Sequence, residues 1–273
     1  MPTQETSLAK LTTVAVFPRY YFLENLAVRH DGSILVTAAL QKELWYIPPA
    51  DAAVRSGPVL VHTFDQLASG IVETQPDVFH ISTSDGYTTH ESFLHRLDLR
   101  HWNPGEPVSA ETVLKFGEPA GGLNGSCLLA PWVIALADSV AGLIWRVDLP
   151  AGDGTATARV WLTHDTMADD FCLDEDAGVA YLTTHRQNTI DRVPLQPDGG
   201  GARQVVAGEP FDEQLVGPSS AAWGRRPGDY GRVAYVTTDG GLIAPPTDDI
   251  VRPAKLLRVD LPAADAAGHD QRD

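Results

Sequence analysis

The sequence repeats a pattern of short apolar segments, and the spacing is clearest in the middle of the chain. Asn124 and Asp169 are 45 positions apart, as are Cys127 and Cys172, and a similar order of apolar runs follows each pair. A period of this length, made of short strands, is typical of propellers and other arrays of small sheets. The repeat therefore predicts a ring of small sheets.

Five such units can be read within a single domain, at roughly residues 11–50, 59–100, 112–150, 158–196 and 203–262. A sheet of four strands cannot bury both faces alone, but sheets arranged around an axis can bury each other's faces. We therefore expect an all-β propeller. The run Val14–Phe17 either opens the first unit or closes the ring as the outer strand of the last one. The polar tail at 263–273 is expected to be frayed.

Composition narrows the class of partner. Hydrophobic residues make up 43% of the chain, enough for a full core, and 24 Gly with 20 Pro supply many turns. The formal net charge of −16 disfavours binding to nucleic acid, because an acidic surface repels phosphates. No apolar run approaches the roughly 20 residues of a membrane span. We expect a small-molecule partner, and the oligomeric state stays open.

The chain start and the cysteines bear on the compartment. Met1–Lys10 is polar and has no apolar core of the kind that a secretory signal needs. Cys127 and Cys172 occupy matching positions inside apolar runs, so we interpret them as buried thiols rather than a disulfide. Together these features predict a cytoplasmic protein.

Polar residues cluster at two kinds of loop that open on the same face, because strands in a blade alternate in direction. Loops that enter the first inner strand of each unit carry Glu24 with Asn25, Ser69, Asn124, Asp169 with Asp170, and Ser219 with Ser220. Loops between the second and third strands carry Gln41, Ser84 with Asp85, Asp138, His185 and Asp239. Loop-borne polar groups at the mouth of a rigid scaffold are the usual place for a site.

Glu24, Asn124 and Asp169 form a set of hard oxygen donors. Such a set suits Ca²⁺, Mg²⁺ or Mn²⁺. The alternative is that each residue caps a turn, since Asn and Asp bond backbone groups at bends without any metal. Adjacent carboxylates at Asp169 and Asp170 favour a bound cation or proton, because like charges repel.

Other residues support weaker assignments. His185 is able to exchange a proton near neutral pH, or it is simply a polar loop residue. Tyr20 and Tyr21 precede Glu24 and either wall an apolar pocket or pack as aromatic core. We find no nucleophile elbow, phosphate-binding Gly loop, dinucleotide fingerprint or paired-Cys zinc spacing.

Several stretches of the sequence resemble the family of senescence marker protein/gluconolactonase/strictosidine synthase-like propellers, in particular its microbial and fungal branch. The resemblance covers about residues 14–262. The stretches that carry it are Leu23–Val28, Leu123–Gly125, Ala168–Leu173, Gly217–Gly224 and Val233–Gly241.

The resemblance implies a divalent cation in the central channel, held by a Glu, an Asn and an Asp. By motif, Glu24 matches the Glu and Asp169 the Asp, which the family is also proposed to use as the base in lactone hydrolysis. Asn124 matches one of two Asn-Gly loops. The family usually has six blades, whereas five are legible here, and the unit expected between Val147 and Trp161 is missing together with the second Asn-Gly loop.

Three functions follow as hypotheses. The first is a lactonase-like hydrolase in which Glu24, Asp169 and Asn124 hold a cation that polarises a carbonyl and activates water, Asp169 or Asp170 accepts the proton, and Asp138 and His185 orient the substrate. The second is a metal-free cyclase or pericyclase, Diels–Alderase-like, in natural-product assembly. The third is a non-catalytic binding scaffold. In the enzyme hypotheses the expected substrate contacts are Tyr20, Tyr21, Asn25, Ser69, Asp138, Ser219, Ser220 and Asp239.

Overall fold

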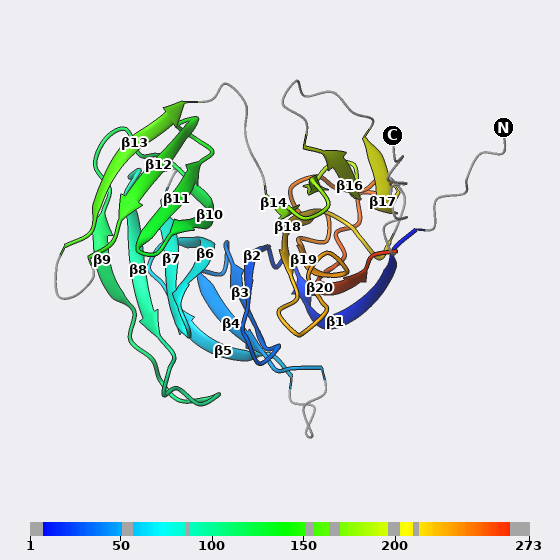
Figure 1. The fold of residues 1–273 in the computed structure, drawn as a ribbon, viewed down its shortest axis with the longest axis horizontal. Coiled ribbons are helices and arrows are strands. Elements are labelled where there is room, and N and C mark those ends of the chain that lie inside the picture. The colour runs from blue at the N-terminus through cyan, green and yellow to red at the C-terminus, as the bar shows by residue number, and fades with distance from the viewer. Residues whose placement is uncertain are drawn as a thin grey trace, which may run out of the picture.

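The computed structural model describes residues 8–50, 57–85, 88–150, 155–163, 170–195, 203–209 and 213–262. Over these residues the chain forms twenty strands arranged as five four-stranded antiparallel sheets, here called blades 1 to 5. The sheets follow one another around a common axis (Figure 1). The predicted all-β propeller is confirmed, with five blades.

Each blade runs from an inner strand at the axis to an outer strand at the rim. Blade 1 holds β2 (Leu23–Val28), β3 (Ile34–Ala38), β4 (Glu43–Ile47) and β5 (Val59–Thr63). Blade 2 holds β6 (Leu67–Gln75), β7 (Val78–Ser84), β8 (Ser92–Asp98) and β9 (Glu111–Lys115). Blade 3 holds β10 (Leu123–Ala130), β11 (Val133–Asp138), β12 (Leu143–Asp148) and β13 (Thr157–Thr163).

Blades 4 and 5 complete the ring, and blade 5 contains both ends of the described chain. Blade 4 holds β14 (Phe171–Asp174), β15 (Val179–Thr184), β16 (Thr189–Pro194) and β17 (Gln204–Gly208). Blade 5 holds β18 (Pro218–Trp223), β19 (Val233–Thr238), β20 (Pro253–Asp260) and β1 (Lys10–Arg19). Because β1 pairs with β20, the start of the chain closes the ring and covers an edge, one of the two placements expected for Val14–Phe17.

The blades are displaced by one strand from the repeats read in the sequence. The strand that opens each predicted repeat pairs as the outermost strand of the preceding sheet, as β5 does with β4. The order of apolar runs is the same in either grouping. Sequence periodicity fixes this order but does not say which run begins a sheet.

Hydrophobic clusters join most neighbouring blades. Separate clusters lie between blades 5 and 1, 1 and 2, 2 and 3, and 4 and 5. Within the described ranges no such cluster lies between blades 3 and 4, whose outer strands stand apart in Figure 1. We call this junction the seam.

Side chains beside the seam are correspondingly exposed. All of β2 is buried, whereas Leu128 and Leu129 on β10 are 41% and 42% exposed. Phe171 on β14 is 48% exposed, while Leu26, which occupies the same slot in blade 1, is 4% exposed. The seam also explains Cys127, which is exposed rather than buried as the sequence suggested, while Cys172 is buried and both thiols are free.

A set of hydroxyl groups links successive blades near the axis. In blade 1, Thr37 Oγ1 donates to the carbonyl of Ser69 in blade 2 over 2.6 Å. The same link recurs from blade 2 to 3, from 4 to 5 and from 5 to 1, donated by Ser82, Thr183 and Thr237. Blade 3 has Ala137 at this position and no hydroxyl to donate.

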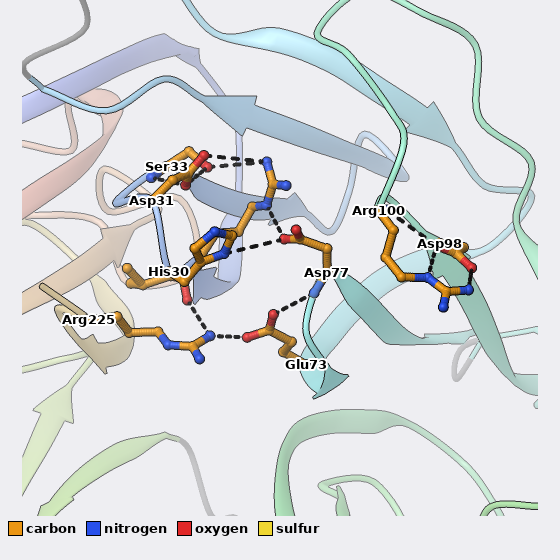
Figure 2. Close-up of polar contacts among 10 residues, drawn as sticks. His30, Asp31, Ser33, Glu73, Asp77, Asp98, Arg100 and Arg225 are labelled. Carbon is orange, nitrogen blue, oxygen red and sulfur yellow. Dashed lines mark hydrogen bonds and ion pairs between the residues drawn. The ribbon is translucent and has the colours of Figure 1, made fainter. Parts of the chain in front are cut away.

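The opposite face of the ring is tied by ion pairs, which Figure 2 shows in close-up. Arg29 of blade 1 donates from Nε to Oδ1 of Asp77 in blade 2 over 2.8 Å. Arg225 of blade 5 pairs with Glu73 of blade 2 and also donates to the carbonyl of Val28 over 3.2 Å. Blades 5, 1 and 2 therefore form one cross-linked unit. Among the described residues, none forms a helix with the length and apolar character needed to cross a membrane.

Candidate active site

A cavity of about 310 Å³ opens on the face where the inner strands begin. All five blades contribute to it, and its polar lining comes from Glu24, Ser69, Ser84, Asn124, Ser139 and His185. Both loop classes expected to meet at the mouth are represented. A volume near 300 Å³ is at the small end of the range of ligand sites, which extends to about 1,000 Å³.

A bulge places each polar residue at the start of its inner strand. The pairing of β2 with β3 shifts register around Glu24, and that of β10 with β11 shifts around Asn124 and Gly125. Blades 2 and 5 have the same shift at Ser69–Gly70 and at Ser219. A bulge redirects a side chain that would otherwise continue the alternation of the strand. The local backbone thus aims these residues at the axis.

Glu24 and Asn124 line the same cavity from blades 1 and 3, as the metal hypothesis requires. Glu24 is 7% exposed, and Asn124 is oriented by its Nδ2, which donates to Ser139 Oγ over 3.1 Å. Asp169 lies outside the described residues. The part of the chain that the structure describes contains no group of three His, Cys, Asp or Glu side chains able to hold a metal ion. Two hard oxygen donors in one cavity nevertheless suit a cation of the calcium or magnesium class in their chemistry.

His185 lines the cavity from the β15–β16 hairpin of blade 4, and a carboxylate lies behind it. Its Nε2 is 3.2 Å from Oδ2 of Asp239, which is fully buried on blade 5. Asp239 also accepts hydrogen bonds from the backbone N–H groups of Gly241 and Ile243, at 2.7 and 2.8 Å. The backbone contacts hold the carboxylate in place, so the carboxylate in turn holds the imidazole. Asp239 therefore lies beside a cavity residue rather than in the cavity lining.

Asp170 occupies the repeat position of Asn25 and Ser220, one residue after the position that Glu24 and Asn124 hold in their blades. Its carboxylate accepts hydrogen bonds from Asn25 Nδ2 at 2.9 Å, from Ser220 Oγ at 2.5 Å and from the N–H of Phe171 at 2.9 Å. Burial raises the pKa of this carboxyl above its usual value, and the three hydrogen bonds oppose that rise. Asn25, Asp170 and Ser220 thus join blades 1, 4 and 5 across the axis. The cavity lining does not include them.

Serine hydroxyls predicted to touch substrate are hydrogen-bonded to neighbouring blades. Ser69 Oγ donates to the carbonyl of Leu123 and Ser219 Oγ to that of Leu23, both over 2.5 Å. Ser69 still lines the cavity, whereas Ser219 lies outside its lining. Both hydroxyls serve closure of the ring.

Asp138 is a buried turn cap. Its carboxylate accepts hydrogen bonds from the N–H groups of Gly121, Gly122 and Ala141 at 2.8, 2.8 and 2.9 Å. These contacts fix the hairpin that carries Ser139 into the cavity. Asp138 thus stands behind the wall, and the residue after it reaches the cavity.

The aromatic wall is Phe22 rather than the two tyrosines before it. Tyr20 is 62% exposed and Tyr21 packs against Phe17, with ring centroids 5.7 Å apart. Burial, with the nearby carboxylate of Glu43, raises the pKa of Tyr21. Phe22 lines the cavity and lies 6.1 Å from the His185 ring. Its place directly before Leu23–Glu24 was the available signal, since residues flanking an axial carboxylate share its loop.

Comparison with known proteins places the chain by its fold. No family model and no curated protein sequence matches it. The structure is similar to luciferin-regenerating enzyme, with 14% identity, 92% of this chain and 95% of that chain covered, and a TM-score of 0.57. It is also similar to PQQ-bound aldose sugar dehydrogenase from Streptomyces coelicolor, with 11% identity, coverage of 93% and 98%, and a TM-score of 0.64.

A third structure is the calcium-binding protein regucalcin from Agrobacterium tumefaciens, with 14% identity and coverage of 91% and 95%. Its TM-score is 0.44. At these identities the comparisons establish the fold. The resemblance read in the sequence is confirmed at that level: the chain is a propeller structurally similar to luciferin-regenerating enzyme.

Proposed function

We propose that the protein is a small-molecule enzyme that hydrolyses a lactone or ester in the axial cavity. The observation that carries this proposal is the meeting of Glu24, Asn124 and His185, from three blades, in one cavity of ligand size. Luciferin-regenerating enzyme, a propeller of similar fold, is by its name also an enzyme on a small molecule.

His185 supplies proton transfer in this proposal. A neutral imidazole whose Nε2–H faces Asp239 carries its basic lone pair on Nδ1. An imidazole lone pair that faces the cavity is able to remove a proton from a bound water. Asp239 holds the ring and stabilises the imidazolium that forms, which makes it a positioning residue. Asp169, outside the described residues, is the other candidate base.

The neighbouring side chains orient the carbonyl. The amide of Asn124 and the hydroxyls of Ser84 and Ser139 line the cavity and offer hydrogen-bond partners for the ester oxygens. A cation held by Glu24, Asn124 and Asp169 would polarise the carbonyl and lower the pKa of a bound water. Glu24 is a ligand in this scheme and not the base.

The decisive test is acid release from a panel of lactones and esters, measured for the parent protein and for His185→Gln. A loss of at least about a hundredfold in kcat/KM is expected. His30→Gln is the matched control, because the His30 side chain is 66% exposed beside Asp77, on the face opposite the cavity, and does not line the cavity. Parallel assays with a chelator and with Asp169→Asn report on the cation. Hydrolysis unaffected by His185→Gln, by chelator and by Asp169→Asn would exclude the proposed site.

A cyclase or pericyclase is the second candidate, and the cavity walls favour it. Phe22, Leu40, Leu67, Val140 and Ile243 make most of the wall apolar. Such a cavity is able to hold a reactive conformer away from water without acid–base chemistry. Turnover of a polyene that persists in chelator and in His185→Gln, with no acid release from any ester, would favour this candidate.

A further inference from the structure

The entrance of the axial cavity carries aliphatic side chains that remain exposed to water. Leu40, Val140 and Ile243 line the cavity and are 44%, 58% and 51% exposed. They come from the loops between second and third strands in blades 1, 3 and 5, so they surround the opening. We call these three residues the apolar rim.

The rim is built into the fold. Val140 rests on the turn at Gly121 and Gly122, where an added Cβ on Gly122 would lie only 2.4 Å from the Val140 side chain. Ile243 follows a turn in which Asp239 accepts the N–H groups of both Gly241 and Ile243. Leu40 follows Ala39, whose N–H donates to the carbonyl of Phe22 over 2.8 Å. Each rim residue is thus placed by neighbouring hydrogen bonds or packing.

The cavity therefore has two chemically distinct ends. Glu24 and Ser69, each 7% exposed, and Ser84, 4% exposed, mark the inner end, whereas the three exposed aliphatic groups mark the outer end. Apolar groups gathered at the mouth of a ligand-sized cavity are typical of a binding site for an apolar ligand.

We propose that the substrate is an amphiphilic lactone or ester, with its carbonyl at the inner end and an alkyl or similarly apolar substituent across the apolar rim. This inference rests on the proposed hydrolase function and adds the substrate class. It excludes polyhydroxylated lactones as good substrates. Their hydroxyl groups would face aliphatic walls and lose hydrogen bonds to water without replacement.

The test separates binding from hydrolysis by using ketones. Cyclopentanones with an alkyl chain at position 3 keep the ring and carbonyl of a γ-alkyl lactone but have no bond that can be hydrolysed. Calorimetry with chains from methyl to octyl measures affinity directly. We expect affinity to rise about two- to fourfold for each added methylene until the rim is covered, because each buried methylene contributes to transfer from water.

The triple variant Leu40→Ser, Val140→Ser and Ile243→Ser should flatten this dependence on chain length. The matched control carries Leu60→Ser, Val160→Ser and Val205→Ser, which replace residues with exposures of 43%, 41% and 38% on the outer strands β5, β13 and β17. The control should keep the dependence of the parent. Circular dichroism and thermal melting of both variants verify that the two proteins are folded.

Three results of the binding experiments would overturn the inference. One is an affinity independent of chain length, and another is an equal dependence in the rim variant and in the control. The third combines two measurements: the parent and the control sediment with neutral phosphatidylcholine vesicles but the rim variant does not, and ketone affinity does not depend on chain length. This result would assign the rim to binding a membrane surface. Ketone binding with the expected dependence but no ester hydrolysis would refute the proposed function and leave this inference standing. Hydrolysis that prefers glucono-δ-lactone would do the reverse.

Discussion

The carboxylate of Asp239 lies directly behind the imidazole of His185, with Oδ2 of the former 3.2 Å from Nε2 of the latter. The two residues come from blades 5 and 4, and only the histidine reaches the cavity. Asp239 is fully buried and is bonded to two backbone N–H groups as well. One buried carboxylate therefore fixes both a loop at the cavity mouth and the proposed base.

The first prediction concerns Asp239→Asn. We expect kcat/KM for ester hydrolysis to fall at least about tenfold. The acid limb of its pH profile should move to lower pH, because a neighbouring carboxylate stabilises the imidazolium. Steady-state kinetics between pH 5 and 9 measure both effects.

Asp138→Asn is the control for this variant. Asp138 is likewise fully buried and caps a turn at the mouth, but its partners are backbone N–H groups and Trp145. Its replacement should lower the melting temperature without moving the pH profile. Equal shifts of the profile in both variants would show that Asp239 acts only through the loop.

The second prediction concerns the carboxyl of Asp170, whose pKa is raised by burial. A carboxyl with a raised pKa in the folded state stabilises the fold at pH values below its unfolded pKa, and this contribution is lost as pH rises through the folded pKa. Asp170→Asn removes that loss. The free energy of unfolding of the variant, relative to the parent, should therefore increase from pH 4 upward. Urea titrations at several pH values give this difference.

A difference that stays constant with pH would show that the carboxyl has the same pKa in the folded and unfolded chain. Asp248→Asn is a suitable comparison, because hydrogen bonds to Arg252 lower the pKa of Asp248 instead. The free energy of unfolding of Asp248→Asn, relative to the parent, should fall as pH rises from about 2 to 4, because the lowered pKa stabilises the fold only where Asp248 is ionised. The opposite signs make the pair diagnostic.

The third prediction is acid sensitivity of blade 2. Burial lowers the pKa of His80 and of His95 to about 4, with Arg96 adding to the effect at His80 and His62 at His95. A histidine with a depressed pKa contributes stability that is complete above its unfolded pKa near 6.5 and is lost as pH falls towards 4. Each residue is expected to cost about 3 kcal/mol across that window.

Unfolding by urea between pH 7 and pH 4 measures this loss, and His80→Gln should reduce it by about half. Glutamine retains a polar group for Thr74, whose hydroxyl lies 3.0 Å from His80 Nδ1. His30→Gln, at a histidine side chain that is 66% exposed, should leave the slope unchanged. An unchanged slope in His80→Gln would mean that the histidine is protonated equally in both states.

The fourth prediction compares one slot in two blades. Leu26→Ala removes a side chain that is 4% exposed and packs in the cluster between blades 5 and 1, and should cost about 2–5 kcal/mol. Phe171→Ala, in the same slot of blade 4 beside the seam, removes one that is 48% exposed. Its cost should stay below about 1 kcal/mol. Chemical denaturation of both variants makes the comparison, and equal costs would show that the seam is packed in solution.

The repeat predicted the order of the strands because each unit obeys the same alternation of apolar runs and turns, and the five units legible in the sequence correspond to the five blades. It also predicted that Glu24, Asn124 and His185 would meet, since position within a repeat determines height along the axis. It could not separate Asp239 from Asp138. Both follow the second strand of their blade, and only the neighbouring blade decides whether a histidine stands beside the carboxylate.

Contacts between distant segments account for the other differences between the structure expected from the sequence and the structure observed. Arg225 and Glu73 are 152 positions apart, and no local pattern announces their ion pair. Cys127 lies in an apolar run that reads as core, but its blade lacks a packed neighbour on that side. Tyr21 packs on Phe17, and that ring on β1 of blade 5 is itself held against Trp45 on β4 of blade 1. Each depends on which sheets adjoin, and that is a property of ring closure.

Ala137 breaks the succession of hydroxyl links at the place where the apolar clusters also stop. Four of the five junctions between blades are packed by apolar clusters, whereas the seam has none among the described residues. Thermal motion should concentrate there, so amide hydrogens of β10 and β14 should exchange sooner than those of β2. A ring of this kind can widen its axial channel by opening at the seam, while the four packed junctions between blades stay intact.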